Sequence, residues 1–291
     1  MYKQVQSRDG QQDLRIFNNS LSTDLKGIAE DDRASLECCL MYLLKQLAYD
    51  FYEETWSENV QGQLNRFLTY AWLNARIWNE NGRDTSFCTY NDSGVQELHW
   101  ATFLLAATEQ WPEASWLAEY LLSKYVEGGT EIVLEEDRHD YVFHYLFKLL
   151  FTTLIDGRWP EAFPSELGPY GELLANRFDP EKVSIALGKI MDIRFARNHA
   201  YPEIDSPKRF RPLASNLIGA TDYVIFPAEL WAIKALCKRI DNIELSLQGE
   251  HPWLQAGFMV PPPAILEPWN DDVTEVVVKY GNKKFGKDWL C

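Results

Sequence analysis

The residues best placed to do chemistry lie in the stretch EEDRHDYVFH, at positions 135–144. Asp140 and His144 are four residues apart, so a helix would place both side chains on one face and could offer them to a hard or borderline cation. A zinc-protease motif, however, spaces two histidines four apart, whereas His139 and His144 are five apart on diverging faces. We therefore interpret the stretch as a solvated helix N-terminus whose acids complement the helix dipole, and we expect no metal.

Other catalytic patterns are absent or unspecific. The chain contains neither the GxSxG motif of serine hydrolases nor the glycine-rich motifs that bind ATP and NAD, so we expect no cofactor. Paired carboxylates suited to glycoside hydrolysis cannot be singled out in a chain with 43 Asp and Glu. Glu97 and Glu229 differ from the others because each lies between apolar residues of a helical pattern, which predicts burial and a hydrogen bond to backbone or arginine. We expect no enzyme, and a small all-α hydrolase is the weakest alternative.

The cysteines and the apolar runs indicate the cellular compartment in which the protein is expected. Five cysteines without CxxC spacing argue against a disulfide framework and a thiolate zinc site, and predict reduced, mostly buried thiols. No apolar run reaches the roughly 20 residues that a membrane-spanning helix needs. The N-terminal sequence MYKQVQSRDGQQDLRIF has neither the apolar core nor the cleavage site of a signal peptide. We expect a cytoplasmic protein that does not enter a membrane.

A helical period runs through most of the chain. After Asp31, a candidate N-cap, apolar residues from Leu36 to Phe51 recur at spacings of three and four and predict a long amphipathic helix. The same period recurs in four further segments, at residues 59–80, 93–110, 112–126 and 140–155. Short polar connections between such helices predict antiparallel neighbours.

These elements predict an all-α single domain of about ten antiparallel helices, arranged as an array of helical hairpins. Further helices are expected to begin at Asp179-Pro180 and after Phe226-Pro227. The proline-rich end should wrap over the helical body in extended form, and its β-branched run TEVVVKY at 274–280 indicates one short β element. The predicted parts are an N-terminal segment (1–30), a first helical half (31–156), a second helical half (165–247) and an extended C-terminal segment (248–291).

The charge balance indicates the kind of partner. Acids outnumber Lys and Arg by 43 to 28, a net charge of −15, yet the chain is 46% hydrophobic and 14% aromatic, which is enough to form a core. Such a surface repels nucleic acid and anionic membranes and attracts basic proteins. In the stretch YDFYEETWSE, at 49–58, aromatic residues alternate with acids, a composition typical of protein interfaces.

The segment 222–254 carries a family resemblance. Phe226 and Pro227 lead into Ala228-Glu229 at the start of a helix, and a short loop then leads to His251-Pro252-Trp253. In this pattern the segment resembles the C-terminal part of helical immunity proteins of bacterial polymorphic-toxin and type VI secretion systems. The long proline-rich tail departs from the family pattern.

The resemblance implies a non-enzymatic protein that binds a cognate toxin and neutralises it. Many such toxins are nucleases with basic clefts, which an acidic inhibitor could occupy. The alternative is a helical-repeat scaffold, although the 34-residue period of tetratricopeptide repeats is missing; a homodimer is left open. The acidic and aromatic residues that we expect to contact the toxin are Asp50, Glu53, Glu54, Trp56, Glu58, Glu135, Glu136 and Asp137.

Overall fold

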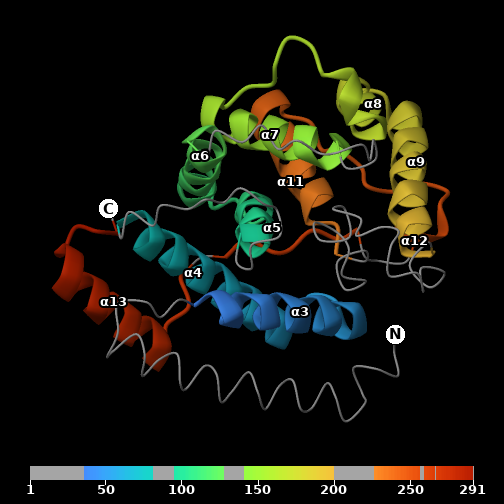
Figure 1. Ribbon diagram of the computed structural model, residues 1–291. Coiled ribbons are helices and arrows are strands. Elements are labelled where there is room, and N and C mark those ends of the chain that lie inside the picture. Colours follow the sequence, from blue (N-terminus) through green and yellow to red (C-terminus); the bar gives the residue numbers. More distant parts are fainter. Residues whose placement is uncertain are drawn as a thin grey trace, which may run out of the picture.

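The computed structural model describes residues 36–80, 95–127, 141–199, 226–255, 259–265 and 267–290. Within these ranges the regular structure is helical and contains no strand, so the predicted all-α fold is confirmed (Figure 1). In chain order the elements are α3 (Glu37–Glu54), α4 (Glu58–Glu80), α5 (Val95–Ala107), α6 (Trp111–Glu127), α7 (Tyr141–Asp156), the 3-10 turn η1 (Ser165–Leu167), α8 (Pro169–Ala175), α9 (Pro180–His199), α11 (Ala228–Leu236), the π-helical turn η3 (Cys237–Asp241), α12 (Pro252–Gln255) and α13 (Asp272–Phe285).

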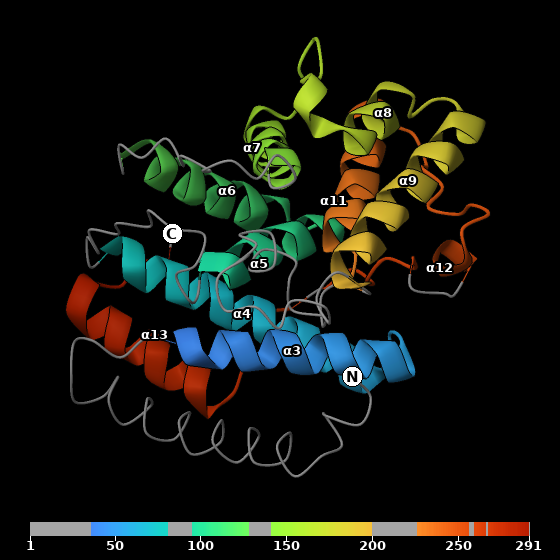
Figure 2. The same cartoon turned by 45° about the vertical axis from the view of Figure 1, so that its right-hand side comes forward.

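Helix α5 lies at the centre of the fold. Its sequence, VQELHWATFLLAA, is apolar on nearly every side, which is typical of a helix enclosed by others. It packs against α4, α6 and α11, and both Trp100 and Phe103 are fully enclosed. Figures 1 and 2 show α3 and α4 along one side of the molecule and α6, α7 and α8 along the other, with α5 and α11 between them.

Consecutive helices pack against each other, as the short polar connections predict. The pairs are α3 with α4, α5 with α6, α6 with α7, and α8 with α9. Helix α9 begins at Pro180, directly after Asp179, and α11 begins after Phe226-Pro227, so both predicted helix starts are confirmed. Helix α11 then returns to α5 from far along the chain, which joins the two halves of the helical array.

The C-terminal segment wraps over α4 and the turn that precedes it, as predicted. The indole N–H of Trp56 donates to the carbonyl of Val260 at 2.8 Å, and the amide of Asn65 donates to the carbonyl of Glu267 at 2.9 Å. The backbone N–H of Trp269 then donates to the hydroxyl of Thr69 at 3.0 Å. The segment therefore follows the direction of α4.

The β element predicted at 274–280 is wrong, because this run lies inside helix α13. Asp271 caps the helix: its Oδ1 accepts from the backbone N–H of Thr274, whose hydroxyl accepts from the backbone N–H of Asp271. Val273, Val277 and Gly281, spaced four apart, are buried on the face toward α4. Capping and this helical spacing override the β preference of the valines. The C-terminal segment is therefore extended only in part.

Candidate functional site

The predicted acidic stretch forms the turn between α3 and α4, which we call the α3–α4 elbow (residues 50–58). Glu54 ends α3 and Glu58 begins α4, and both side chains are exposed. Between them Thr55 has φ 52° and ψ −134°, a region that favours glycine, and its N–H donates to the carbonyl of Phe51 at 2.8 Å. The sharp turn therefore presents two carboxylates at one end of the α3–α4 pair.

Asp50 is held in place by both helices of the elbow. Its Oδ1 accepts from the amide of Gln46 at 2.8 Å, and its Oδ2 accepts from the amide of Gln63 at 2.5 Å. Glu54 in turn accepts from the hydroxyl of Ser57 at 2.8 Å. These neutral donors orient the two carboxylates, and no described cation forms an ion pair with either of them.

Trp56 contributes mainly to the interior of the elbow. Its ring centroid lies 4.6 Å from that of Phe51 and 5.4 Å from that of Trp231, and its N–H is bonded to Val260. The indole is therefore a tether between the elbow, α11 and the C-terminal segment. Among the described side chains of the elbow, those of Glu54, Thr55 and Glu58 are exposed, and two of these carry carboxylates.

The structure does not describe the side chains of the remaining residues that were predicted to contact the toxin. The side chain of Glu53 on α3 is not among the described groups, and Glu135, Glu136 and Asp137 fall in the undescribed stretch 128–140. The same holds for the metal-like pattern at 135–144, apart from the backbone that begins α7. Among the described residues no group of three or more His, Cys, Asp or Glu could hold a metal ion.

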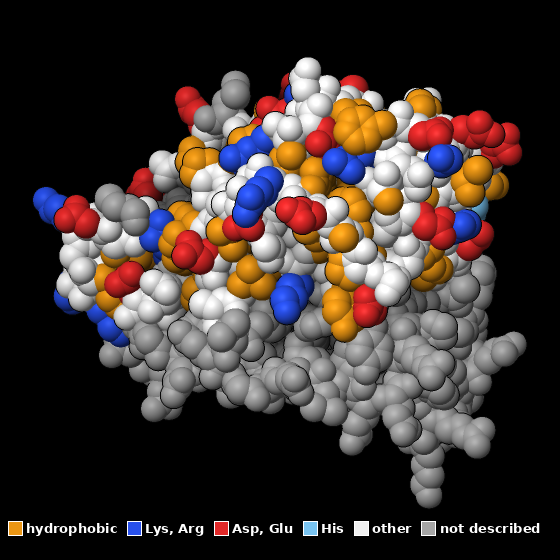
Figure 3. Space-filling view, turned by 90° about the horizontal axis from the view of Figure 1, so that it is seen from above, with side chains coloured by type: hydrophobic (Ala, Val, Ile, Leu, Met, Phe, Trp, Pro, Cys, Tyr) orange, Lys and Arg blue, Asp and Glu red, His pale blue; other side chains and the backbone are white. Residues whose placement is uncertain are grey.

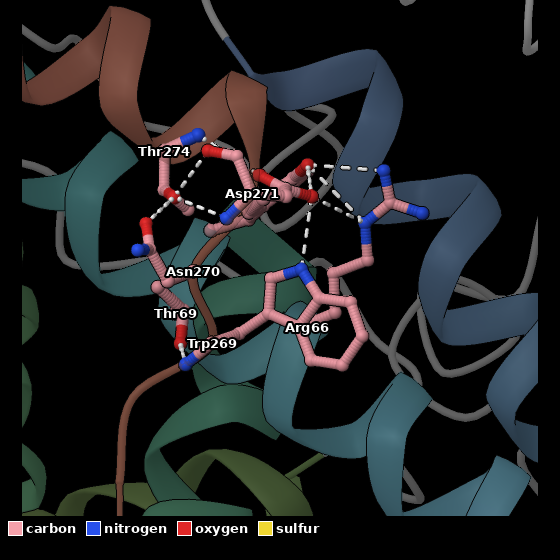
Figure 4. Close-up of polar contacts among 7 residues, drawn as sticks. Arg66, Thr69, Trp269, Asn270, Asp271 and Thr274 are labelled. Carbon is pink, nitrogen blue, oxygen red and sulfur yellow. Dashed lines mark hydrogen bonds and ion pairs between the residues drawn. The ribbon is translucent and has the colours of Figure 1, made fainter.

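A polar network further along α4, where α13 begins, was missed by the sequence analysis. The carboxylate of Asp271 accepts from the hydroxyl of Tyr70 and the indole N–H of Trp269, both at 2.9 Å, and lies 3.4 Å from the guanidinium of Arg66 (Figure 4). Burial raises the pKa of Tyr70 and by itself would raise that of Asp271. Its hydrogen bonds, first that from the backbone of Thr274, outweigh burial and hold the pKa of Asp271 below its usual range. The one local signal was the spacing of Asp271 and Thr274, which fits a capping box.

The segment that resembles immunity proteins, residues 222–254, contributes one residue of a buried ion pair. Glu229, in the first turn of α11, pairs with Arg194 of α9, and both side chains are at most 1% exposed. The same Glu229 oxygen accepts from the hydroxyl of Tyr170 of α8 at 2.9 Å. Burial, together with the adjacent carboxylate, raises the pKa of Tyr170 well above its usual value. The predicted burial of Glu97 and Glu229 is confirmed, and Glu229 has the expected arginine partner.

In the described ranges, exposed acids that form no ion pair outnumber exposed cations that have no carboxylate partner. Exposed cations without a carboxylate partner are fewer in the same described ranges: Lys148, Arg158, Arg239, Lys279, Lys283 and Lys287. The exposed acids that form no ion pair within them are Glu54, Glu58, Glu80, Glu119, Asp156, Glu161, Glu166, Glu181, Glu250, Glu267, Asp272, Glu275 and Asp288.

Comparison with protein-family models, with curated proteins and with solved structures found no match for this chain. None of the described helices combines the length and the apolar character that crossing a bilayer requires. The resemblance of residues 222–254 to immunity proteins therefore stays a prediction from the sequence.

Proposed function

We propose that this protein is a cytoplasmic immunity protein that binds a cognate bacterial toxin, a nuclease in the first instance, and neutralises it without catalysis. One observation carries the proposal. In the described ranges, exposed carboxylates that form no ion pair outnumber exposed Lys and Arg side chains that form none. Unpaired surface carboxylates attract a basic protein and speed its association. The resemblance of residues 222–254 supplies the class of partner.

The α3–α4 elbow is the proposed first contact. The carboxylates of Asp50 and Glu54 accept hydrogen bonds from the neutral groups of Gln46, Gln63 and Ser57, and neither forms an ion pair within the described ranges that a partner would have to break. The elbow is also anchored to α11 through Trp56 and Trp231. A rigid, acidic projection of this kind fits the basic substrate cleft of a nuclease.

The first experiment is co-expression with the product of the gene directly upstream. If the proposal holds, that product is toxic alone, becomes harmless in the presence of this protein, and co-purifies with it. Association followed by surface plasmon resonance should slow steeply as salt is raised, because charge steers the encounter. Absence of both toxicity and a complex would overturn the proposal.

The elbow itself is tested with a pair of variants of equal charge. We expect Glu54→Gln/Glu58→Gln to slow association more than Glu119→Gln/Glu275→Gln, which removes the same charge from exposed positions on α6 and α13. Equal effects of the two variants would show that the elbow has no special part in binding.

A further inference from the structure

A second exposed surface lies on the other side of the molecule from α3 and α4, where α7, α8 and α9 meet. Phe178, between α8 and α9, is 66% exposed, more than any other large hydrophobic side chain in the described ranges. The Cζ atom of Arg177 lies 4.7 Å from the ring centroid of Phe178 and 5.8 Å from those of Trp159 and Phe163. We call these residues, with Asp241, the Phe178 cluster.

The Phe178 cluster is held rigid by Asp241. The Nε–H of Arg177 donates to one oxygen of Asp241 at 2.6 Å, and its Nη2 donates to the other at 3.3 Å. The indole N–H of Trp159 donates to the same carboxylate at 2.8 Å, and Nη1 of Arg177 donates to the carbonyl of Leu174 at 2.8 Å. Three hydrogen bonds therefore fix Arg177, and its guanidinium lies over the exposed ring of Phe178 in a cation–π contact.

Asp241 also connects the cluster to the end of α11. It closes the π-helical turn η3, which is followed by Asn242 in the left-handed conformation. Single π-helical turns are rare and recur at functional sites. On the same turn, Arg239 lies over the ring of Trp111 with its Cζ 4.4 Å from the centroid. Trp and Arg are enriched at the energetic centres of protein interfaces, and here the exposed Arg239 of the turn lies beside the half-buried Trp111 of α6.

The charge around the cluster indicates its partner. Four exposed acids between the end of α7 and the start of α9, Asp156, Glu161, Glu166 and Glu181, form no ion pair in the described ranges. The corresponding exposed cations are two, Arg158 in the same segment and Arg239 on the turn of Asp241. Figure 3, which looks down on this side, shows hydrophobic side chains lying among charged ones. A second copy of this chain would bring like charges together at a net charge of −15 each, so self-association is disfavoured.

We propose that the Phe178 cluster is a docking site for a basic protein surface, with a projecting apolar side chain packed on Phe178 and Lys or Arg side chains facing the surrounding acids. The inference rests on the proposed function, and the partner is the toxin itself.

The test uses the full chain and, as probe, the purified product of the upstream gene. Phe178→Ser removes an exposed ring and leaves the core intact, so its thermal unfolding should match that of the wild type. Val276→Ser, on exposed α13, is the matched control, since Val276 is 37% exposed and lies outside the Phe178 cluster. We expect Phe178→Ser to weaken binding by about 10- to 30-fold in calorimetric titration, and Val276→Ser to leave it unchanged.

Three other outcomes would overturn the inference. If the wild type neutralises the probe and Phe178→Ser binds equally well, the docking site is refuted while the proposed function stands. If the wild type neither neutralises nor binds the probe, the proposed function and the docking site are both refuted. If sedimentation shows a wild-type dimer that Phe178→Ser converts to monomer, the occupant of the site is a second copy of this chain.

Discussion

The hydroxyl of Tyr70 donates a 2.9 Å hydrogen bond to the carboxylate of Asp271, which lies 201 residues further along the chain. The same carboxylate caps α13 and accepts from the indole of Trp269. One side chain therefore starts a helix and attaches it to α4.

Asp271→Ala should lower the free energy of unfolding by about 2–3 kcal/mol, because it removes the helix cap and leaves Tyr70 without its acceptor. Urea denaturation measures this change. Asp272→Ala is the matched control, since the neighbouring carboxylate is exposed and makes no ion pair in the described ranges. A loss no larger than that of the control would contradict the role assigned to Asp271.

The depressed pKa of Asp271 predicts how this contribution depends on pH. A carboxyl with a lower pKa in the folded state stabilises the protein fully above its unfolded pKa of about 3.9, and the gain disappears as pH falls through the folded pKa. The stability difference between wild type and Asp271→Asn should therefore be constant near neutral pH and narrow below about pH 4. Thermal unfolding at a series of pH values measures it, and a difference that widens in acid would refute the assignment.

Local patterns predicted the helices but not the contacts between distant segments. The helix predicted from the leucines between Leu36 and Leu47, and the helix start predicted at Asp179-Pro180, each rest on a few neighbouring residues. Both helices are present in the structure. The valines at 276–278 were assigned to a strand because their β preference is local, whereas the α4 face that buries Val277 is distant in the sequence. Likewise, nothing near Arg177 indicates that its carboxylate is Asp241, 64 residues away.

Breaking the buried pair of Arg194 and Glu229 should be costly. Glu229→Gln removes the carboxylate charge that faces the buried Arg194 guanidinium, and we expect a loss of about 3–5 kcal/mol in unfolding free energy. In a double-mutant cycle with Arg194→Met, the double variant should lose less than the sum of the single losses. Glu172→Gln, which breaks the half-exposed pair with Lys189, should cost no more than about 1 kcal/mol and serves as control. Purely additive losses would mean that the pair is not coupled.

Gly281 gives α13 room for the indole of Trp289. A Cβ at this position would overlap the indole ring, which is 4% exposed and cannot move outward without losing its packing. Gly281→Ala should therefore destabilise the protein by about 1–3 kcal/mol, even though alanine is the better helix former. Combining it with Trp289→Leu should recover part of the loss in the same denaturation assay. An unchanged or raised stability of Gly281→Ala would show that the indole adapts freely.

Cys237 should resist thiol reagents in the native protein. Burial, with a smaller effect from Asp241, raises the pKa of its thiol to about 12, so almost no thiolate is present at pH 8. Peptide mass spectrometry after iodoacetamide treatment should find Cys237 unmodified in the native state and modified in urea. Rapid native labelling at this position would show that the end of α11 opens readily.

The order of contacts along α4 has a consequence for synthesis. Trp56, Asn65, Thr69 and Arg76 meet, in that order, the backbone at Val260, Glu267, Trp269 and Leu290. Each of these partners lies 200 to 214 residues after the side chain that it contacts, so these contacts can form only once the helices between them have been translated. A chain truncated before residue 260 would lack all four contacts, and we expect proteases to cleave it more readily than the chain that carries them.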